Sequence, residues 1–402
     1  MPPAAKASTS GLPPFDPYDP LGLDDLLSDE DRAVRDTVRA WAADRVLPHV
    51  AGWYERGELP VIRELARELG AIGALGMPLT GYGCAGASAV QYGLACLELE
   101  AADSGIRSLV SVQGSLAMYA IHRFGSDEHK ERWLPRMAAG EVIGCFGLTE
   151  PDHGSDPAGM RTRARRDGSD WVLDGRKTWI TNGSVAGVAV VWAQTEDGIR
   201  GFAVPTDTAG FSAPEIHHKW SLRASVTSEL VLDGVRLPAD AVLPGATGLR
   251  GPLSCLSHAR YGIVWGAMGA ARASFEAALD YAGTREQFGR PIGGFQLTQA
   301  KLADMAVELH KGILLAHHLG RRMDAGRLRP EQISFGKLNN VREAIDICRT
   351  ARTVLGANGI SLEYPVMRHA TNLESVLTYE GTVEMHQLVL GKALTGFDAF
   401  RG

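Results

Sequence analysis

The feature that most constrains the fold is a change in hydrophobic periodicity along the chain, from helical spacing to a strand pattern and back. Up to about residue 140, apolar residues recur at the spacing of buried helix faces. From about 145 to 245, short β-branched or aromatic segments alternate with Gly, Asp and Pro, which is typical of strands and turns. Long helical patterns return after Gly251. The sequence therefore predicts a mainly α protein with a middle β-domain.

Domain boundaries are placed at these changes. We expect an N-terminal helical domain over residues 28–144, a β-domain over 145–250 and a C-terminal helical domain over 251–402. Residues 1–27, which begin with a stretch rich in Pro, Ala and Ser, are predicted to be a disordered or extended tail. Ser28 is the expected N-cap of the first helix because acidic residues follow it.

Two later patterns predict how the C-terminal helices pack. One helix face is expected to be buried because small or apolar residues recur at steps of three and four. Its members are Leu302, Met305, Leu309, Gly312, Ala316 and Leu319. The glycines around Gly266 do not follow a strand, so we interpret them as sites of close helix packing and not as a dinucleotide fingerprint.

The composition excludes several classes of protein. The 402 residues are 45% hydrophobic and 22% charged, with a formal net charge of −6, which is an ordinary globular profile. No basic excess favours nucleic acid, and no apolar run reaches the ~18 residues of a membrane span. Five scattered cysteines without CxxC spacing favour reduced thiols and a cytoplasmic location. The adjacent histidine pairs at 217–218 and 317–318 point their side chains in different directions, so no metal site is expected.

Glu380 is the first candidate for a catalytic group. It lies in the stretch LTYEGT at residues 377–382, between an aromatic residue and a glycine. Desolvation in such surroundings raises the pKa of a carboxyl group toward neutrality, as a general base requires. A helix-capping or surface glutamate would have the same local sequence, so this stretch alone leaves the role of Glu380 open.

Three further segments have residues suited to a ligand. Thr149 begins a donor-rich loop that could bind a ring carbonyl or a phosphate, although a polar connection would look similar. Trp179 and Thr181 share a face on a predicted strand, where a planar ligand could stack, although a core tryptophan is the alternative. Arg285 and Gln296 follow a long helix and suit a pyrophosphate, but a solvated turn would contain the same residues.

Taken together, six motifs carry a resemblance to a known family. They are GLTEPDHGSD, KTWITNG, ARYGIVWG, TREQFGRPIGGFQ, LGANGI and TYEGT, in this order. From about residue 28 to its C-terminus the chain resembles the acyl-CoA dehydrogenase family, with most similarity to the glutaryl-CoA dehydrogenase branch. The resemblance implies an N-terminal helical domain, a β-barrel-like middle domain and a C-terminal four-helix bundle. It also implies an assembly of identical subunits, commonly a homotetramer and in some members a dimer, with FAD as the cofactor.

The resemblance assigns sites residue by residue. The implied FAD-binding residues are Phe146, Leu148, Thr149, Gly154, Ser155, Trp179, Ile180, Thr181, Arg285, Phe288, Gln296, Thr353, Leu355, Gly356, Ala357 and Thr382. Those from Arg285 to Ala357 would hold the pyrophosphate and adenosine of an FAD bound largely by a neighbouring subunit. The acyl-CoA channel would be lined by Ser155, residues 253–260 including Arg260, Gly381 and Phe400.

The resemblance also assigns the chemistry. Glu380 matches the base that removes the α-proton of the acyl-CoA, and its backbone N–H would stabilise the enolate. Some branches carry this glutamate just before the arginine that matches Arg260, but here Ala259 stands there and cannot act as a base. Tyr379 matches the decarboxylating type, so crotonyl-CoA and CO₂ are the expected products.

Arg107 indicates the substrate. An arginine at the acyl end of the pocket makes sense if the acyl tail ends in a carboxylate, as in glutaryl-CoA. The resemblance implies that Ser108 flanks it and Glu100 tunes it. Glu100 and Arg107 would lie on one face of a single helix, unless the chain breaks near Gly105 between them. An ordinary surface ion pair is the alternative, and Ile106 departs from the tyrosine of some members.

The sequence thus predicts an FAD-dependent glutaryl-CoA dehydrogenase that passes electrons to an electron-transfer flavoprotein. One alternative is an acyl-CoA dehydrogenase or oxidase for another carboxyl-bearing acyl-CoA. A non-catalytic flavin- or CoA-binding scaffold is the other.

Overall fold

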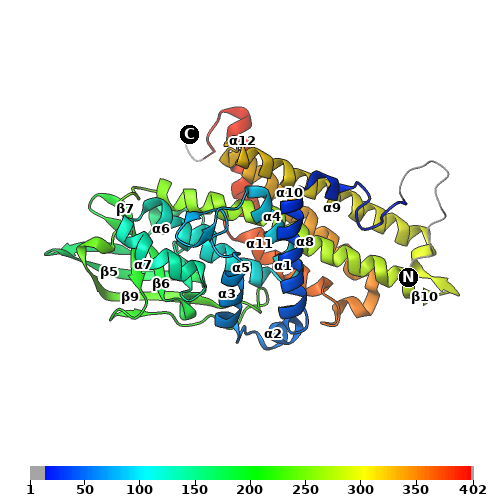
Figure 1. Ribbon diagram of the computed structural model, residues 1–402, viewed down its shortest axis with the longest axis horizontal. Helices are drawn as coiled ribbons and strands as arrows, with labels where there is room; N and C mark the ends of the chain where they lie inside the picture. Colours follow the sequence, from blue (N-terminus) through cyan, green and yellow to red (C-terminus); the bar gives the residue numbers. More distant parts are fainter. Residues whose placement is uncertain (1–13, 400–402) are drawn as a thin grey trace.

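Helices form the first and last parts of the chain, and one large sheet lies between them in sequence (Figure 1). This computed structural model describes residues 14–399. Three hydrophobic clusters lie within or beside the helical parts, and a fourth lies within the sheet. The mainly α fold with a middle β-domain is confirmed.

The N-terminal part contains seven α-helices and a π-helical segment, η2. The helices are α1 (Asp29–Arg45), α2 (Val50–Arg56), α3 (Ile62–Ala71), α4 (Ala89–Ala102), α5 (Ser104–Ser111), α6 (Tyr119–Phe124) and α7 (Asp127–Ala138), with η2 (Val112–Met118) joining α5 to α6. Ser28 caps α1 as predicted: its hydroxyl accepts from the Asp31 N–H, and the Asp31 carboxylate accepts from the Ser28 N–H, both over 3.1 Å.

Part of the predicted tail packs against the C-terminal helices. It contains the 3-10 helix η1 (Leu23–Leu26), and the Tyr18 hydroxyl donates to Asp280 over 2.5 Å. Residues 1–13 lie outside the described range.

The middle part is a seven-stranded sheet. Its strands are β3 (Gly144–Gly147), β4 (Arg163–Asp167), β5 (Asp170–Thr181), β6 (Val188–Thr195), β7 (Gly198–Pro205), β8 (Phe211–Ser212) and β9 (Thr227–Leu237). The order is β3-β6-β4-β5-β9-β8, and β7 pairs with β6. β3 is parallel to β6, whereas β5 and β9 are antiparallel. Small two-stranded sheets are formed by β1 (Thr80–Gly81) with β2 (Cys84–Ala85), and by β10 (Glu286–Gln287) with β11 (Arg290–Pro291).

Five helices form the C-terminal part within the described residues. They are α8 (Arg250–Thr284), α9 (Gln296–Asp324), α10 (Pro330–Leu355), α11 (Val366–Thr378) and α12 (Val383–Thr395). The predicted face of α9 is confirmed: Met305, Leu309, Gly312, Ala316 and Leu319 are buried, and Leu302 is partly buried. No helix within residues 14–399 is long and apolar enough to cross a membrane.

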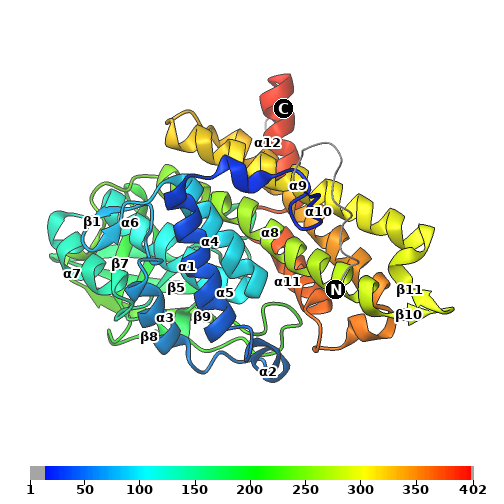
Figure 2. The same cartoon turned by 45° about the vertical axis from the view of Figure 1, so that its right-hand side comes forward.

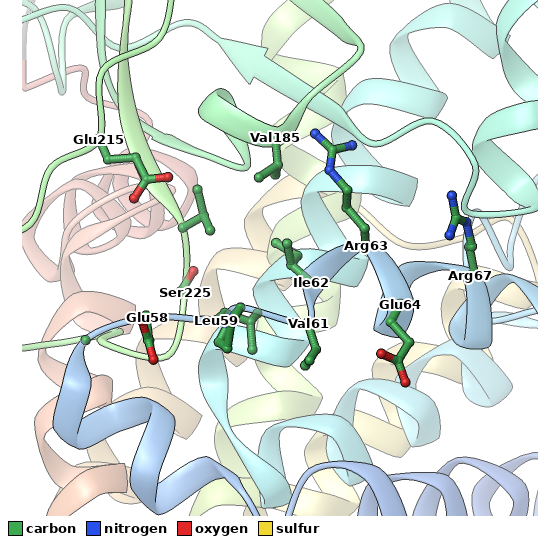
Figure 3. A pocket seen from close by; sticks show the side chains of 13 residues that line it. Glu58, Leu59, Val61, Ile62, Arg63, Glu64, Arg67, Val185, Glu215 and Ser225 are labelled. Atoms are coloured by element: carbon green, nitrogen blue, oxygen red, sulfur yellow. The ribbon is translucent and has the colours of Figure 1, made fainter.

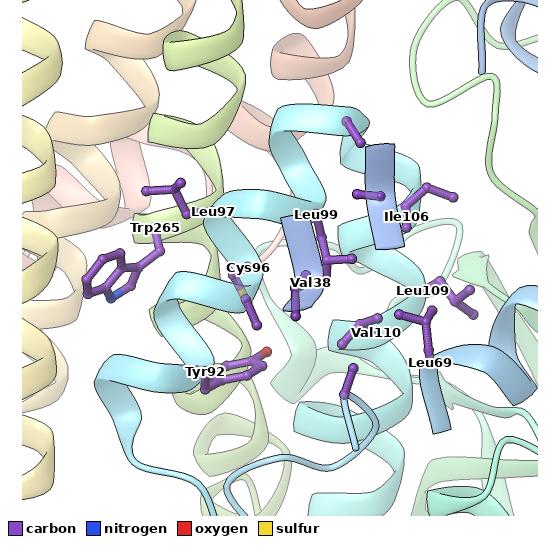
Figure 4. Packing of buried hydrophobic residues seen from close by; sticks show 14 of the residues in the cluster. Val38, Leu69, Tyr92, Cys96, Leu97, Leu99, Ile106, Leu109, Val110 and Trp265 are labelled. Atoms are coloured by element: carbon purple, nitrogen blue, oxygen red, sulfur yellow. The ribbon is translucent and has the colours of Figure 1, made fainter. Parts of the chain in front are cut away.

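Glycines allow α4 and α8 to pack closely, as the sequence predicted. A Cβ on Gly93 would lie 2.3 Å from the Trp265 ring, and one on Gly269 would lie 2.0 Å from the Leu97 carbonyl oxygen. Figure 4 shows Trp265 beside Leu97 in this core. Because the backbones approach so closely, a side chain of α4 such as Glu100 reaches the surface of α8 at Gly266.

A buried network fixes the junction between α4 and α5. Asp103 has an extended backbone (φ −167°), which ends α4 and starts α5. Its carboxylate accepts from the Gly105 N–H over 2.7 Å, from the Asn372 amide over 3.0 Å and from the Arg368 guanidinium. Arg368 also donates to the Ala102 carbonyl over 2.8 Å. The network ties the helix break to α11 and so sets the direction of α5.

Candidate active site

Glu380 lies in the turn between α11 and α12, in a left-handed backbone conformation (φ +54°). Thr382 is the N-cap of α12, since its side chain accepts from the Met385 N–H over 3.3 Å. Glu380 is half-buried, and its Oε2 is buried without a hydrogen-bond partner among the described residues. It is therefore neither a surface residue nor the N-cap of the helix that follows it.

Two basic side chains bind the three carbonyl groups of this turn. Lys337 Nζ donates to the Tyr379 and Gly381 carbonyl oxygens over 2.5 and 2.6 Å. Arg260 Nε donates to the Glu380 carbonyl oxygen over 2.6 Å. Gly381 itself has φ +99°, and a Cβ there would lie 2.9 Å from His386 Nε2.

Sequence reasoning missed Lys337. It lies on α10 in the same buried stripe as Ile333, Val341 and Ala344, and is only 2% exposed. A lysine in register with the apolar face of a helix is a signal that the sequence does contain, because lysine is rarely buried without a specific role.

Burial and neighbouring charges shift the pKa of the Glu380 carboxyl group in opposite directions. Desolvation raises the pKa of Glu380, while the positive charges of Arg107, Lys337 and Arg260 oppose this rise. Burial also lowers the pKa of Lys337 to about 7 and that of His386 to about 3, so His386 is neutral at physiological pH. The carboxylate thus combines a raised basicity with a cationic surrounding.

The predicted acyl-end residues come together beside Glu380. Arg107 on α5 is 1% exposed, and its Nε donates to Glu100 Oε2 over 2.6 Å. The Arg107 guanidinium also donates to the Tyr379 hydroxyl. Ser108 is buried on the same helix as Arg107. Burial raises the pKa of the Tyr379 hydroxyl. The surface ion pair considered from the sequence is therefore wrong.

Glu100 and Arg107 do not lie on one continuous helix. The chain breaks between them, which is the second of the two arrangements considered from the sequence. The break falls at Asp103, two residues before Gly105. Glu100 ends up on α4 and Arg107 on α5, yet the ion pair forms across the junction. Gly266 on α8 makes room for it, since a Cβ there would lie 2.1 Å from Glu100 Oε2 and 3.3 Å from Arg107 Nε.

The first two predicted cofactor segments are adjacent. The Thr178 N–H donates to the Thr149 carbonyl over 2.9 Å. Buried Lys177 donates to the Leu148 carbonyl over 3.1 Å and to Glu150 over 2.9 Å. Phe146 belongs to β3 and so precedes the loop that contains Thr149.

These segments offer both main-chain groups and side chains. The Phe146 and Leu148 side chains are buried in the core, so only their main chain can line a ligand site. Thr149 is half-buried, and Gly154 and Ser155 are exposed.

Trp179 presents its indole to solvent. It is 62% exposed at a bulge in β5, with φ +59°, whereas Ile180 is 4% exposed and Thr181 is half-buried. This alternation agrees with the predicted shared face, but the left-handed backbone was not predicted. A bulky side chain in this conformation is strained, and strain of this kind is concentrated at binding sites. An exposed flat ring beside a hydroxyl fits a flavin.

The remaining cofactor residues lie at the other end of α8. Arg285, Phe288 and Gln296 are exposed around the β10–β11 hairpin, and Phe288 is 94% exposed. Thr353, Gly356 and Ala357 are exposed at the end of α10, near this hairpin, while Leu355 is buried. Figures 1 and 2 place the hairpin opposite the sheet. The 35 residues of α8 span about 50 Å. A single chain therefore does not bring the predicted cofactor residues at the sheet together with those at the hairpin.

Two predicted residues remain. Thr382 caps α12 directly after Gly381, and Phe400 lies outside the described residues.

A cavity of about 530 Å³ lies elsewhere, between the start of α3 and residues 225–226 (Figure 3). Its lining includes Glu58, Arg63 and Glu215, and none of the predicted catalytic, substrate or cofactor residues. The buried titratable groups converge around Glu380 and not at this cavity.

A chain with this helical–sheet–helical fold, a desolvated carboxylate and a buried arginine beside it has the features of an enzyme. Models of the acyl-CoA dehydrogenase N-terminal, middle and C-terminal domains match residues 28–141, 145–235 and 246–395. The chain belongs to the acyl-CoA dehydrogenase family, and it is an acyl-CoA dehydrogenase.

Individual relatives and solved structures are similar to nearly the whole chain. A probable acyl-CoA dehydrogenase of Bacillus subtilis is 34% identical over 92% of this chain and 98% of its own length. A glutaryl-CoA dehydrogenase structure from Mycobacterium smegmatis is 73% identical with a TM-score of 0.94, over 96% of this chain and 99% of that one. A second such structure from that organism, in complex with FADH2, is 65% identical with a TM-score of 0.95, over 96% and 100%.

Proposed function

We propose that the protein oxidises glutaryl-CoA with FAD and decarboxylates the product to crotonyl-CoA and CO₂. The observation that carries this proposal is the buried guanidinium of Arg107, held by Glu100 and Tyr379 beside Glu380. Of its five N–H donors, the Nε–H serves Glu100 and one terminal N–H serves Tyr379, which leaves others for a ligand carboxylate. A pocket for a plain acyl chain would gain nothing from a buried charge.

Glu380 begins the reaction by removing the α-proton. The thioester carbonyl makes this proton acidic, and the Glu380 backbone N–H donates to the enolate oxygen that forms. Arg107 binds the distal carboxylate, so the α-carbon of the five-carbon glutaryl chain is held at Glu380. FAD, when bound, would supply the two-electron acceptor for the β-hydrogen, and loss of this hydrogen leaves a 2,3-double bond in the acyl chain.

Decarboxylation follows from the same arrangement. The bond between the γ-carbon and the carboxylate breaks, CO₂ leaves, and the electron pair enters a dienolate conjugated with the thioester. Glu380, which carries the proton taken earlier, returns a proton to the γ-carbon and yields crotonyl-CoA. Burial of Glu380 supports both roles, because a raised pKa makes it a better base and keeps the proton available.

The cofactor residues lead us to propose a homotetramer with a shared FAD site. Trp179 and Thr181 would line the flavin ring, while Arg285 and Gln296 would hold the pyrophosphate of FAD in a neighbouring subunit. The sheet and the β10–β11 hairpin lie toward opposite ends of α8, whose 35 residues span about 50 Å, and this supports the assignment. The proposed electron acceptor is an electron-transfer flavoprotein.

Anaerobic bleaching of the purified yellow protein tests the proposal. We expect glutaryl-CoA to reduce the flavin much faster than butyryl-CoA does, with crotonyl-CoA and CO₂ identified by mass spectrometry as the products from glutaryl-CoA. If only another dicarboxylyl-CoA bleaches the flavin, that compound is the substrate in place of glutaryl-CoA. If no acyl-CoA bleaches it, the protein is a non-catalytic scaffold. Reoxidation by electron-transfer flavoprotein and by oxygen, compared in the same assay, identifies the acceptor.

A further inference from the structure

We propose that Lys337 is a positioning residue for the base: it binds the carbonyl groups on both sides of Glu380 and thereby holds the carboxylate in its reactive orientation. This inference rests on the proposed function in one respect, which is the identity of Glu380 as the base.

The environment of Lys337 calls for a specific role. Its side chain is 2% exposed on α10, and no ion pair with a carboxylate is found for it within residues 14–399. Burying an ammonium group is unfavourable, and the charge of the nearby Glu380 carboxylate offsets only part of this cost. The contacts that offset this are the two carbonyl oxygens at 2.5 and 2.6 Å, which belong to Tyr379 and Gly381.

The geometry of the turn explains what these contacts do. Two carbonyls that flank one residue can meet at a single nitrogen only if the chain reverses between them. Glu380 makes this reversal with φ +54°, a conformation that a residue with a Cβ adopts rarely. Arg260 holds the carbonyl of Glu380 itself. With all three carbonyls bound, the carboxylate can move only about its own side-chain bonds.

Lys337 also contributes charge, which separates its role from a purely structural one. The groups that face it are Arg107 from α5, Arg260 from α8, His386 from α12, and Tyr379 and Glu380 in the turn. Since burial lowers the pKa of Lys337 to about 7, the group exists in both forms near neutral pH. Both the ammonium and the amine donate hydrogen bonds, so the carbonyl contacts persist through this titration.

The test compares Lys337→Met, Lys337→Arg and the wild type by rapid anaerobic flavin reduction at saturating glutaryl-CoA. We expect Lys337→Met to reduce the rate per bound FAD by about 100-fold, because small misplacements of a catalytic group have effects of this size. FAD content and the dissociation constant for glutaryl-CoA should change by less than about threefold. Lys337→Arg, which keeps donors and charge, should recover at least about tenfold of the loss.

The pH profile gives the readout that a structural role would leave unchanged. Loss of a positive charge beside Glu380 raises the pKa of the base, so the acid limb of the rate profile should move to higher pH in Lys337→Met. If this variant does not retain FAD, Lys337→Gln, which keeps one donor group, replaces it with an expected loss of at least about tenfold.

Lys219→Met is the matched control. Lys219 also binds two backbone carbonyls, those of Leu222 and Ser225 over 2.5 and 2.8 Å, but in a different loop. Its substitution should leave the rate per bound FAD unchanged. A wild-type rate in Lys337→Met, or a loss that follows only the Tm and FAD content of both variants, would overturn the positioning role. If glutaryl-CoA fails but another acyl-CoA bleaches the wild type, that compound replaces it in every arm. Absence of bleaching with any acyl-CoA would overturn both proposals.

Discussion

Arg107 and Glu100 form a buried ion pair across a helix break, with Nε and Oε2 2.6 Å apart. With the guanidinium held by this pair, one of its terminal nitrogens donates to the hydroxyl of Tyr379, the residue before Glu380. Removing one partner of such a pair leaves a buried charge, which costs about 3–5 kcal/mol. Selectivity and stability are therefore coupled at this site, and experiments must separate them.

Arg107→Ala should lower kcat/KM for glutaryl-CoA about 10- to 100-fold more than for an uncharged acyl-CoA, since hydrogen bonds to charged groups contribute about 1.5–3 kcal/mol. The double variant Arg107→Ala with Glu100→Gln should recover stability, measured as Tm, without recovering this discrimination. Equal losses for both substrates would make Arg107 structural.

Gly266→Ala should disturb the same pair without touching its charges. The new Cβ would lie 2.1 Å from Glu100 Oε2, so the carboxylate and the guanidinium must move. We expect a lower kcat/KM ratio of glutaryl-CoA to butyryl-CoA. Gly283→Ala on the same helix is the control, because nothing lies within 4 Å of its Cβ position. That variant should gain up to about 1 kcal/mol of stability and keep its selectivity. An unchanged ratio in Gly266→Ala would contradict the role of this glycine.

Glu380→Gln should bind FAD and substrate but lose flavin reduction by about 10²- to 10⁴-fold, the usual contribution of a general base. Substrate binding is measured by the shift of the flavin spectrum, and reduction by stopped flow. Activity close to that of the wild type would rule out Glu380 as the base.

The raised pKa of Glu380 predicts a pH dependence of stability as well as of rate. A carboxyl group whose folded pKa lies above its unfolded value of about 4.3 contributes stability that is full below that value and lost as pH rises through the folded pKa. Glu380→Gln removes this loss, so its Tm relative to wild type should increase with pH across this range. The wild-type rate should rise over the same range, because only the carboxylate accepts the proton. Parallel Tm curves for both proteins would show that burial does not shift this pKa.

Several local features follow from the sequence because their causes are local. Ser28 caps α1 through side chains three residues apart, and one face of α9 is buried as its spacing predicted. The glycines near Gly266 pack closely, as predicted from their size and their position away from any strand. The motif resemblance led to the family and to the residues around Glu380.

Other features depend on contacts between distant segments. Trp179 adopts φ +59° at a bulge that pairing with β9 imposes, which alternation along one strand cannot reveal. The break at Asp103 is stabilised by Arg368 and Asn372, more than 260 residues away. Lys337 binds the carbonyls of the turn around Glu380 only because α10 packs against that turn.

The sequence by itself determined the order of helices and strands, the family, and Glu380, Arg107 and Glu100 as residues of the site, because spacing and motifs record them directly. Tertiary structure alone decided that the pair of Glu100 and Arg107 is buried across a helix break, and that Lys337 and Arg260 bind three consecutive carbonyls. The physical reason is that desolvation and hydrogen-bond geometry depend on which elements pack together. The sequence around Glu380 fits a surface residue as well as a buried one, and the helices around it decide that its carboxyl group is desolvated.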